Sequence, residues 1–195
     1  MSEKKVYVLL TDTGTLFTKT IKLYTRKPYN HASIAFDENL TEVYSFGRKS
    51  PGNPFIGGFV KEDIKKGLFK NATCAVYSLT VSDDDLKRMQ QFIRKLDAQK
   101  ENYRYNLIGL FAVMFNKQLT RENAFFCSQF VATVLNHGES VHFEKPLSLI
   151  TPQDLQTATN FKLEYKGKLR DYKRETAKVN NFAPSPIPML SAEIQ

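Results

Sequence analysis

The segment from Asn123 to Gly138 constrains this chain more than any other part of the sequence. Apolar or small residues recur at positions 127, 130, 131, 134 and 135, which is the spacing of one helix face. Asn136 and His137 followed by Gly138 are typical of a helix end. The pattern therefore predicts a helix that carries Cys127 in its first turn, in phase with its buried side.

The position of Cys127 at a helix start has a chemical consequence. The positive end of the helix dipole lowers the pKa of a thiol and favours the nucleophilic thiolate. A thiolate nucleophile also needs a base, and His31 at the start of the strand-like run 31–36 is the candidate. The alternative is that Cys127 simply packs in the core, because free cysteine is among the most buried residue types.

Length and composition favour a single globular domain, which we expect to span residues 1–175, followed by an extended tail at 176–195. The hydrophobic fraction of 42% is enough for a substantial core. No run of eighteen apolar residues occurs, so we expect no transmembrane segment. The first residues lack the apolar core of a signal peptide, and we therefore expect a cytoplasmic location with reduced cysteines.

The net charge of +8 permits binding to nucleic acid or to another acidic surface. The basic residues are spread along the chain, however, and the densest stretch, 162–174, is interleaved with Leu, Tyr and Asp. Such a pattern is typical of the solvated face of strands. Because no nucleic-acid-binding motif accompanies the charge, we expect no specific nucleic-acid partner.

The rest of the chain alternates between strand and helix patterns and predicts the α+β class. Strands are expected at 5–10, 31–36, 42–46, 73–81, 161–165 and 168–172, and helices at 15–24, 82–99, 106–115 and 151–158. The helix at 106–115 is very apolar, which predicts a buried position. Proline and glycine residues at 50–58 predict an irregular loop.

Two motifs and their order resemble a known family. They are His31-Ala-Ser-Ile-Ala, expected in a strand, and Phe126-Cys-Ser-Gln-Phe-Val, expected at a helix start. A histidine before a late cysteine resembles the circularly permuted papain-like group of the NlpC-type superfamily, which includes relatives of lecithin:retinol acyltransferase. The likeness covers roughly residues 5 to 137, and the whole chain most resembles bacterial proteins of this group. It implies a papain-like (NlpC-type) fold with an antiparallel sheet packed against helices.

The resemblance also implies a thiol hydrolase (amidase, peptidase or esterase) or an acyltransferase that needs neither cofactor nor metal. Cys127 would attack the carbonyl of a small-molecule, peptide or lipid acyl substrate, with His31 as the general base. A third polar residue on the adjacent strand would orient the imidazole. Matching the family pattern selects Ser45, a weak partner where relatives more often carry His, Glu, Asn or Gln. Glu42 remains the alternative if the register differs by one residue.

Three further residues are candidates for substrate contacts. The backbone N–H of Cys127 is the expected first oxyanion donor. Tyr7 and Tyr29 are candidates for the second donor, and Ser128 lies beside the nucleophile.

Other functions stay open at this point. One is an inactive protein of the same fold that binds a peptide, glycan or lipid, and another is a basic interaction protein in which Cys127 merely packs. A zinc site formed by Cys127, His137 and His142 lacks the paired spacing of zinc ligands and is disfavoured. The sequence leaves the oligomeric state open.

Overall fold

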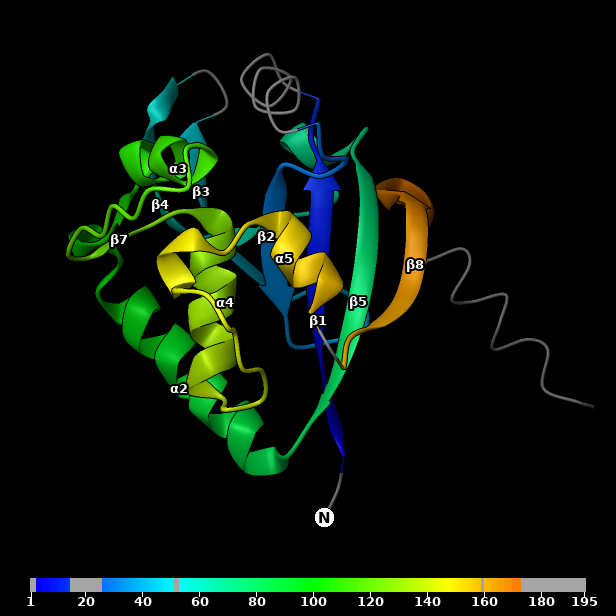
Figure 1. Cartoon of the computed structure of the whole chain (residues 1–195). Coiled ribbons are helices and arrows are strands. Elements are labelled where there is room, and N and C mark those ends of the chain that lie inside the picture. The colour runs from blue at the N-terminus through cyan, green and yellow to red at the C-terminus, as the bar shows by residue number, and fades with distance from the viewer. Residues whose placement is uncertain (1–2, 15–25, 51–52, 159, 173–195) are drawn as a thin grey trace, which may run out of the picture.

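The chain folds around a six-stranded antiparallel sheet with the strand order β4-β3-β2-β1-β5-β8. The computed structural model describes residues 3–14, 26–50, 53–158 and 160–172. Helices α2, α4 and α5 all contribute to the core on one face of the sheet (Figure 1). The expected α+β class with an antiparallel sheet packed against helices is therefore confirmed.

The elements are bounded as follows. The sheet contains β1 (Lys4–Asp12), β2 (His31–Ala35), β3 (Val43–Ser50), β4 (Asn53–Glu62), β5 (Thr73–Val81) and β8 (Lys162–Lys168). The helices are α2 (Asp83–Ala98), α3 (Leu107–Met114), α4 (Cys127–His137) and α5 (Pro152–Thr157). A separate parallel pair is formed by β6 (Arg104–Tyr105) and β7 (Ala124–Phe125). Short 3₁₀ turns lie at Gly67–Phe69, Lys100–Asn102, Leu147–Leu149 and Leu169–Asp171.

Reciprocal capping bonds set the starts of α2 and α5. The Ser82 hydroxyl accepts the Asp85 N–H at the start of α2, and the Asp85 carboxylate accepts the Ser82 N–H in return. Thr151 and Asp154 form the same reciprocal pair at the start of α5. Each pair satisfies two N–H groups that have no partner within the helix, which is why both helices begin where they do.

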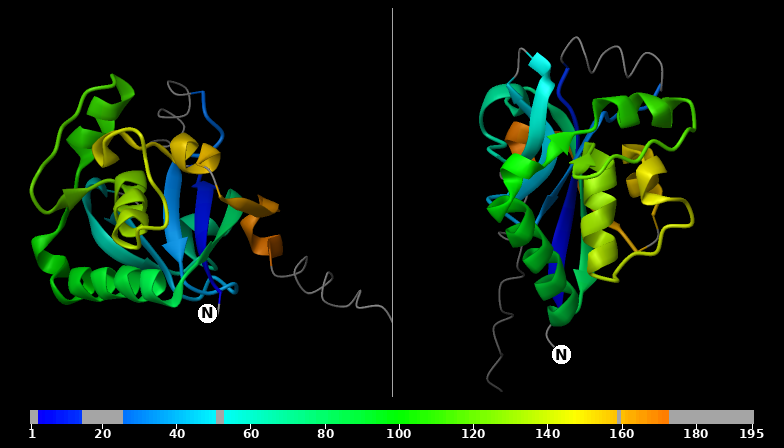
Figure 2. Two further views of the ribbon diagram at one scale, coloured as in Figure 1. Left: turned by 60° about the horizontal axis from the view of Figure 1, so that its bottom comes forward. Right: turned by 90° about the vertical axis from the view of Figure 1, so that its left-hand side faces the viewer.

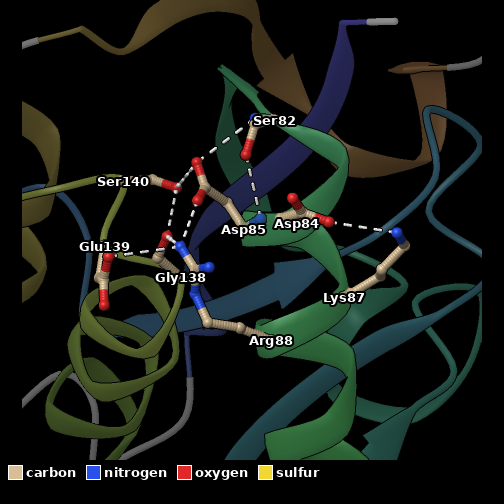
Figure 3. Close-up of polar contacts among 8 residues, drawn as sticks. All are labelled: Ser82, Asp84, Asp85, Lys87, Arg88, Gly138, Glu139 and Ser140. Atoms are coloured by element: carbon tan, nitrogen blue, oxygen red, sulfur yellow. Dashed lines mark hydrogen bonds and ion pairs between the residues drawn. The ribbon is translucent and has the colours of Figure 1, made fainter. Parts of the chain in front are cut away.

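The start of α2 is also tied to the end of α4. Arg88 donates to the Asp85 carboxylate and, over 3.1 Å, to the Gly138 carbonyl that follows α4 (Figure 3). Ser140 donates to Asp85 as well. These bonds fix the C-terminal end of α4 against α2. The two further views show α2 and α4 packed side by side on the sheet (Figure 2).

One predicted loop is wrong, because residues 53–62 form strand β4. Gly57 and Gly58 lie within this strand and pair with β3. A Cβ at Gly57 would come within 2.6 Å of the Gly47 carbonyl oxygen and 2.8 Å of the Tyr105 Cβ. Glycine is needed here for close packing of backbone and side chain, and not for a turn.

Two other expectations are corrected at the C-terminal side of the molecule and at α3. Residues 169–171 form a 3₁₀ turn where a strand was expected, and Gly167 continues β8. Helix α3 forms as expected but is not buried, since Ile108 and Phe111 are exposed. The predicted helix at 15–24 and the predicted tail at 176–195 lie outside the described residues.

A cluster of aromatic rings holds α4 against the sheet. Phe46 on β3 is fully buried, with its ring centroid 5.2 Å from that of Phe130 on α4 and 5.1 Å from that of Phe125. Phe59 on β4 and Tyr103 lie 6.0 Å and 6.2 Å from the same ring. Such pairs add about 0.5–1.5 kcal/mol each beyond the burial of their apolar area. Within the described residues, no helix combines the length and apolar character needed to cross a membrane.

We predict that Phe46→Ala lowers the free energy of unfolding by about 3–5 kcal/mol, because it removes the ring at the centre of this cluster and leaves a cavity. Denaturant unfolding of the purified protein measures the loss. Leu163→Ala is the matched control, since Leu163 is 49% exposed on β8 and should change stability by less than about 0.5 kcal/mol. Equal effects of the two substitutions would contradict a central role for this cluster.

Candidate active site

The N-terminus of α4 places Cys127 at the centre of the candidate site. Cys127 is the first residue of the helix, and the preceding Phe126 has extended backbone angles (φ −104°, ψ 168°). The backbone N–H groups of Ala32 on β2 and of Ser128 both donate to the Cys127 sulfur. Cys127 is only 2% exposed. The sulfur is therefore surrounded by donors that favour its charged form.

His31 reaches Cys127 because of how β2 is paired. On one side β2 pairs with β1 along its whole length, with His31 opposite Thr11. On the other side it pairs with β3 at Ile34 and Ala35, so that His31 lies beyond this pairing. Helix α4 packs against both β2 and β3 at this point. The imidazole of His31 forms a hydrogen bond with the Cys127 thiol.

The second partner of the imidazole is Glu62, the last residue of β4. His31 Nε2 lies 2.7 Å from Glu62 Oε1. The same carboxylate accepts the hydroxyl of Ser45 at Oε1 and the hydroxyl of Ser33 at Oε2, both at 2.5 Å. The Glu62 side chain is 7% exposed. A buried carboxylate is stable only when it is paired and hydrogen-bonded, and Glu62 has both kinds of partner.

The sheet register brings these groups together. Ala35 pairs with Val43, so continuing the same register places Ser33 opposite Ser45 and His31 opposite Gly47. Val43 in turn pairs with Glu62 on β4. Because alternate residues of a strand share a face, the two serines, His31 and Glu62 all lie on one face of the sheet.

Gly47 leaves space beside the imidazole. A Cβ at this position would lie 3.6 Å from His31 Cε1 and 3.3 Å from Ser45 Oγ. On another side, the ring centroid of Phe69 lies 6.1 Å from that of His31. The imidazole is thus bounded by strand backbone, an aromatic ring, a carboxylate and a thiol.

The three titratable groups shift one another. Burial lowers the pKa of His31, but the Glu62 charge and hydrogen bonds with Cys127 and Glu62 outweigh it and raise that pKa to about 10. Burial raises the pKa of Cys127, yet the hydrogen bond and charge of His31 bring it below its ordinary value. Burial likewise opposes ionisation of Glu62, and its pKa is lowered by the His31 charge and the three donors. The site therefore favours thiolate, imidazolium and carboxylate together.

Glu62 occupies the position that sequence reasoning gave to Ser45 or Glu42. The Ser45 hydroxyl donates to the Glu62 carboxylate, which in turn contacts the imidazole of His31. Glu42 is exposed and lies 3.6 Å from the ammonium group of Lys61. Glu62 was not among the predicted site residues, because an irregular loop was expected at 50–58, where most of its strand lies. The available signal for that strand was its content of aromatic and β-branched residues, Phe55, Ile56, Phe59 and Val60, which strands favour.

The three proposed substrate contacts lie in different surroundings. Tyr7 lies opposite Ala35, about 13 Å along β1 from the partner of His31, so the structure does not bring it to Cys127. Tyr29 is buried in the main core, where burial and then Tyr77 and Cys74 raise its pKa. The Ser128 hydroxyl donates to the Ile150 carbonyl over 2.7 Å. Ser128 thus serves the site through its backbone N–H.

The remaining histidines lie apart from this network. The His137 ring stacks on Phe92 with 4.0 Å between centroids, and burial, followed by the charge of Lys95, lowers its pKa. His142 is exposed. Within the part of the chain that the structure describes, no group of three or more potential ligands could hold a metal ion.

Comparison of the chain with protein-family models, with curated proteins and with solved structures finds no match. The chemistry of the site lies in Cys127, His31 and Glu62. These residues come from α4, β2 and β4, and their side chains form one continuous hydrogen-bonded chain.

We predict that Ser33→Ala and Ser45→Ala each lower the free energy of unfolding by about 1–3 kcal/mol at pH 7, because a buried carboxylate loses a donor. The pKa of Glu62 is lowered in the folded state, so its contribution is present above its unfolded pKa and is lost as pH falls through the folded pKa. The difference between wild type and variant should therefore stay constant from pH 7 down to the unfolded pKa of a glutamate, about 4.3, and shrink as pH falls further through the folded pKa. Denaturant unfolding over that range measures it.

Ser78→Ala is the matched control for these substitutions. Ser78 is also a buried strand serine that donates to a carboxylate, Glu164, but it lies on β5 at the other side of the sheet. It should leave Cys127 alkylation unchanged. A pH-independent loss of stability in the Ser33 and Ser45 variants would show that their hydroxyls do not act through Glu62.

Proposed function

We propose that this protein is a thiol hydrolase or acyltransferase of the circularly permuted papain-like type. Cys127 is the nucleophile, His31 is the general base and acid, and Glu62 orients the imidazole. The observation that carries the proposal is the continuous chain of contacts from the Cys127 thiol through His31 to the buried Glu62 carboxylate, 2.7 Å from His31 Nε2. Nucleophile, base and orienting acid in this order are the arrangement used by thiol enzymes.

The two cysteines of the chain support a catalytic rather than a packing role for Cys127. Both are free and buried. Burial raises the pKa of Cys74 to about 12, whereas the pKa of Cys127 is lowered by its partners. The difference arises from His31 and from two backbone N–H groups, and not from exposure. A structural cysteine does not require such an environment.

The proposed reaction has two steps. The Cys127 thiolate attacks the carbonyl carbon of an amide, ester or thioester, and the His31 imidazolium gives its proton to the departing amine, alcohol or thiol. Water or another acceptor then attacks the acyl-enzyme, while His31 takes its proton and the thiolate leaves. Glu62 stabilises the imidazolium in each step. The backbone N–H of Cys127, at the free end of α4, is suited to stabilise the oxyanion.

We predict that Cys127 reacts with iodoacetamide at pH 6 well ahead of Cys74, because only Cys127 is held as a thiolate. His31→Ala should remove most of this advantage. Glu62→Gln should raise the pKa of Cys127, since it lowers that of His31 and so weakens the ion pair. Site-resolved alkylation rates against pH, read by mass spectrometry, measure all three. Equal rates at Cys127 and Cys74 would contradict the proposed dyad.

We further predict that a panel of activated acyl esters and anilides leaves a stable acyl group on Cys127 or is turned over by it. Glu62→Gln should lower kcat/KM by at least about tenfold, because the imidazole loses its orienting carboxylate. Cys127→Ser should abolish covalent labelling, which intact-protein mass spectrometry detects. Ser78→Ala serves again as the matched control. Labelling that persists in Cys127→Ser would place the chemistry elsewhere.

One observation favours a second candidate function, a protein of this fold that binds a peptide, glycan or lipid without turnover. Cys127 is 2% exposed and the His31 side chain 15%, so a substrate carbonyl has little access to the sulfur in this conformation. The alkylation experiment separates the two functions. A thiolate that a small reagent cannot reach would favour binding over catalysis.

A further inference from the structure

The face of α3 is unusually apolar for a solvent-exposed surface. Ile108, Phe111 and Phe115, the last at the C-cap, are 57%, 42% and 64% exposed. Among the described residues, the other large apolar side chain exposed to this degree is Leu163 on β8. Spacings of three and four residues place the three α3 side chains on one side of the helix. We call this set the α3 face.

Hydrogen bonds fix both ends of the segment that carries the α3 face. Asn106, which is fully buried, accepts the Gly109 N–H at the start of α3 and donates to the Leu119 carbonyl beyond its end. The Lys117 N–H bonds back to the Ala112 carbonyl over 2.9 Å and closes the last turn. Both ends of the segment are thus fixed from within, so the fold holds these apolar side chains in place at the surface.

This surface lies at the same end of the molecule as Cys127. The Asn106 N–H donates to the Phe125 carbonyl over 2.8 Å, and Tyr105 pairs with Phe125. Phe125 is two residues before Cys127. Two views agree in placing α3 beyond the N-terminal end of α4 (Figures 1 and 2).

The charged residues of the chain segment that carries α3 have one sign. Between Glu101 and Glu122 every charged residue is basic, namely Arg104, Lys117 and Arg121, and all three are exposed. The chain as a whole carries a net charge of +8. Exposed Phe and Ile side chains flanked by Lys and Arg are the combination that binds at the interface of an anionic bilayer.

We propose that the α3 face docks the protein on the surface of an anionic lipid bilayer, with α3 lying in the plane of the interface. Three partly exposed side chains offer on the order of 300 Å² of apolar surface. That is far below the roughly 800 Å² per partner of a stable protein–protein interface, but it suits weak interfacial binding assisted by charge. The proposal does not rest on the catalytic role of Cys127.

The chain contains no tryptophan, which provides a direct reporter. Phe115→Trp keeps the α3 face apolar and introduces a single indole there. Its emission should shift to the blue when vesicles of phosphatidylcholine with phosphatidylglycerol are added, and much less with phosphatidylcholine alone. Leu163→Trp is the matched control, since it places the same indole at the exposed position on β8. It should report no shift.

Co-sedimentation with the same vesicles measures affinity. Phe111→Ser combined with Phe115→Ser should weaken binding about tenfold or more, because the inserted rings are lost. Lys117→Gln combined with Arg121→Gln should weaken it less and reduce its salt dependence. Leu163→Ser should bind like wild type. Unfolding curves confirm that each variant is folded, and the Trp reporter provides the test if the serine variant is not.

Either of two results would overturn the proposal. One is an indole at position 115 that does not respond to anionic vesicles. The other is an emission shift that follows protein concentration without vesicles, which would show that a second copy of the chain covers the α3 face.

Discussion

The carboxylate of Glu62 is a buried charge. It is stable only with hydrogen-bond donors around it, and these donors come from the two neighbouring strands β2 and β3. It accepts hydrogen bonds from His31 and Ser33 on β2 and from Ser45 on β3, while its own backbone belongs to β4. Removing the His31 imidazolium would leave the buried carboxylate without its charged partner, which costs several kcal/mol. The same bonds that satisfy the carboxylate therefore set the relative positions of β2, β3 and β4 at this end of the sheet.

The effect of Glu62 extends to a sulfur atom that it does not contact. Its charge keeps His31 protonated up to a pKa of about 10, and the protonated ring in turn favours the Cys127 thiolate. Above that pH the imidazolium and its stabilising ion pair are lost together. The sheet carries His31 and Glu62, and the aromatic cluster around Phe46 holds the helix that carries the Cys127 thiol. The packing of α4 on the sheet therefore also fixes the position of Cys127, the first residue of that helix.

The α3 face differs from the candidate site because its side chains are exposed and apolar. Hydrogen bonds of Asn106 fix both ends of its helix, while Ile108, Phe111 and Phe115 remain exposed. Large apolar side chains that are this exposed often mark a site of interaction. Since the Asn106 N–H at the start of α3 bonds to the Phe125 carbonyl on β7, the strand that leads into Cys127, an interface bound at the α3 face would lie at the same end of the molecule as the thiol.

The sequence alone determined what depends on neighbours along the chain. The start of α4 at Cys127, strand 73–81 and the capped starts of α2 and α5 follow from periodicity and from hydrogen bonds within a few residues. Only the tertiary structure decided the partner of His31, because Glu62 lies 31 residues away and meets it through strand pairing. Glycine at 57 gave the local signal of a turn, but close packing of two strands and Tyr105 requires it. The apolar composition of α3 could not reveal its exposure, since burial depends on what the rest of the fold places against a helix.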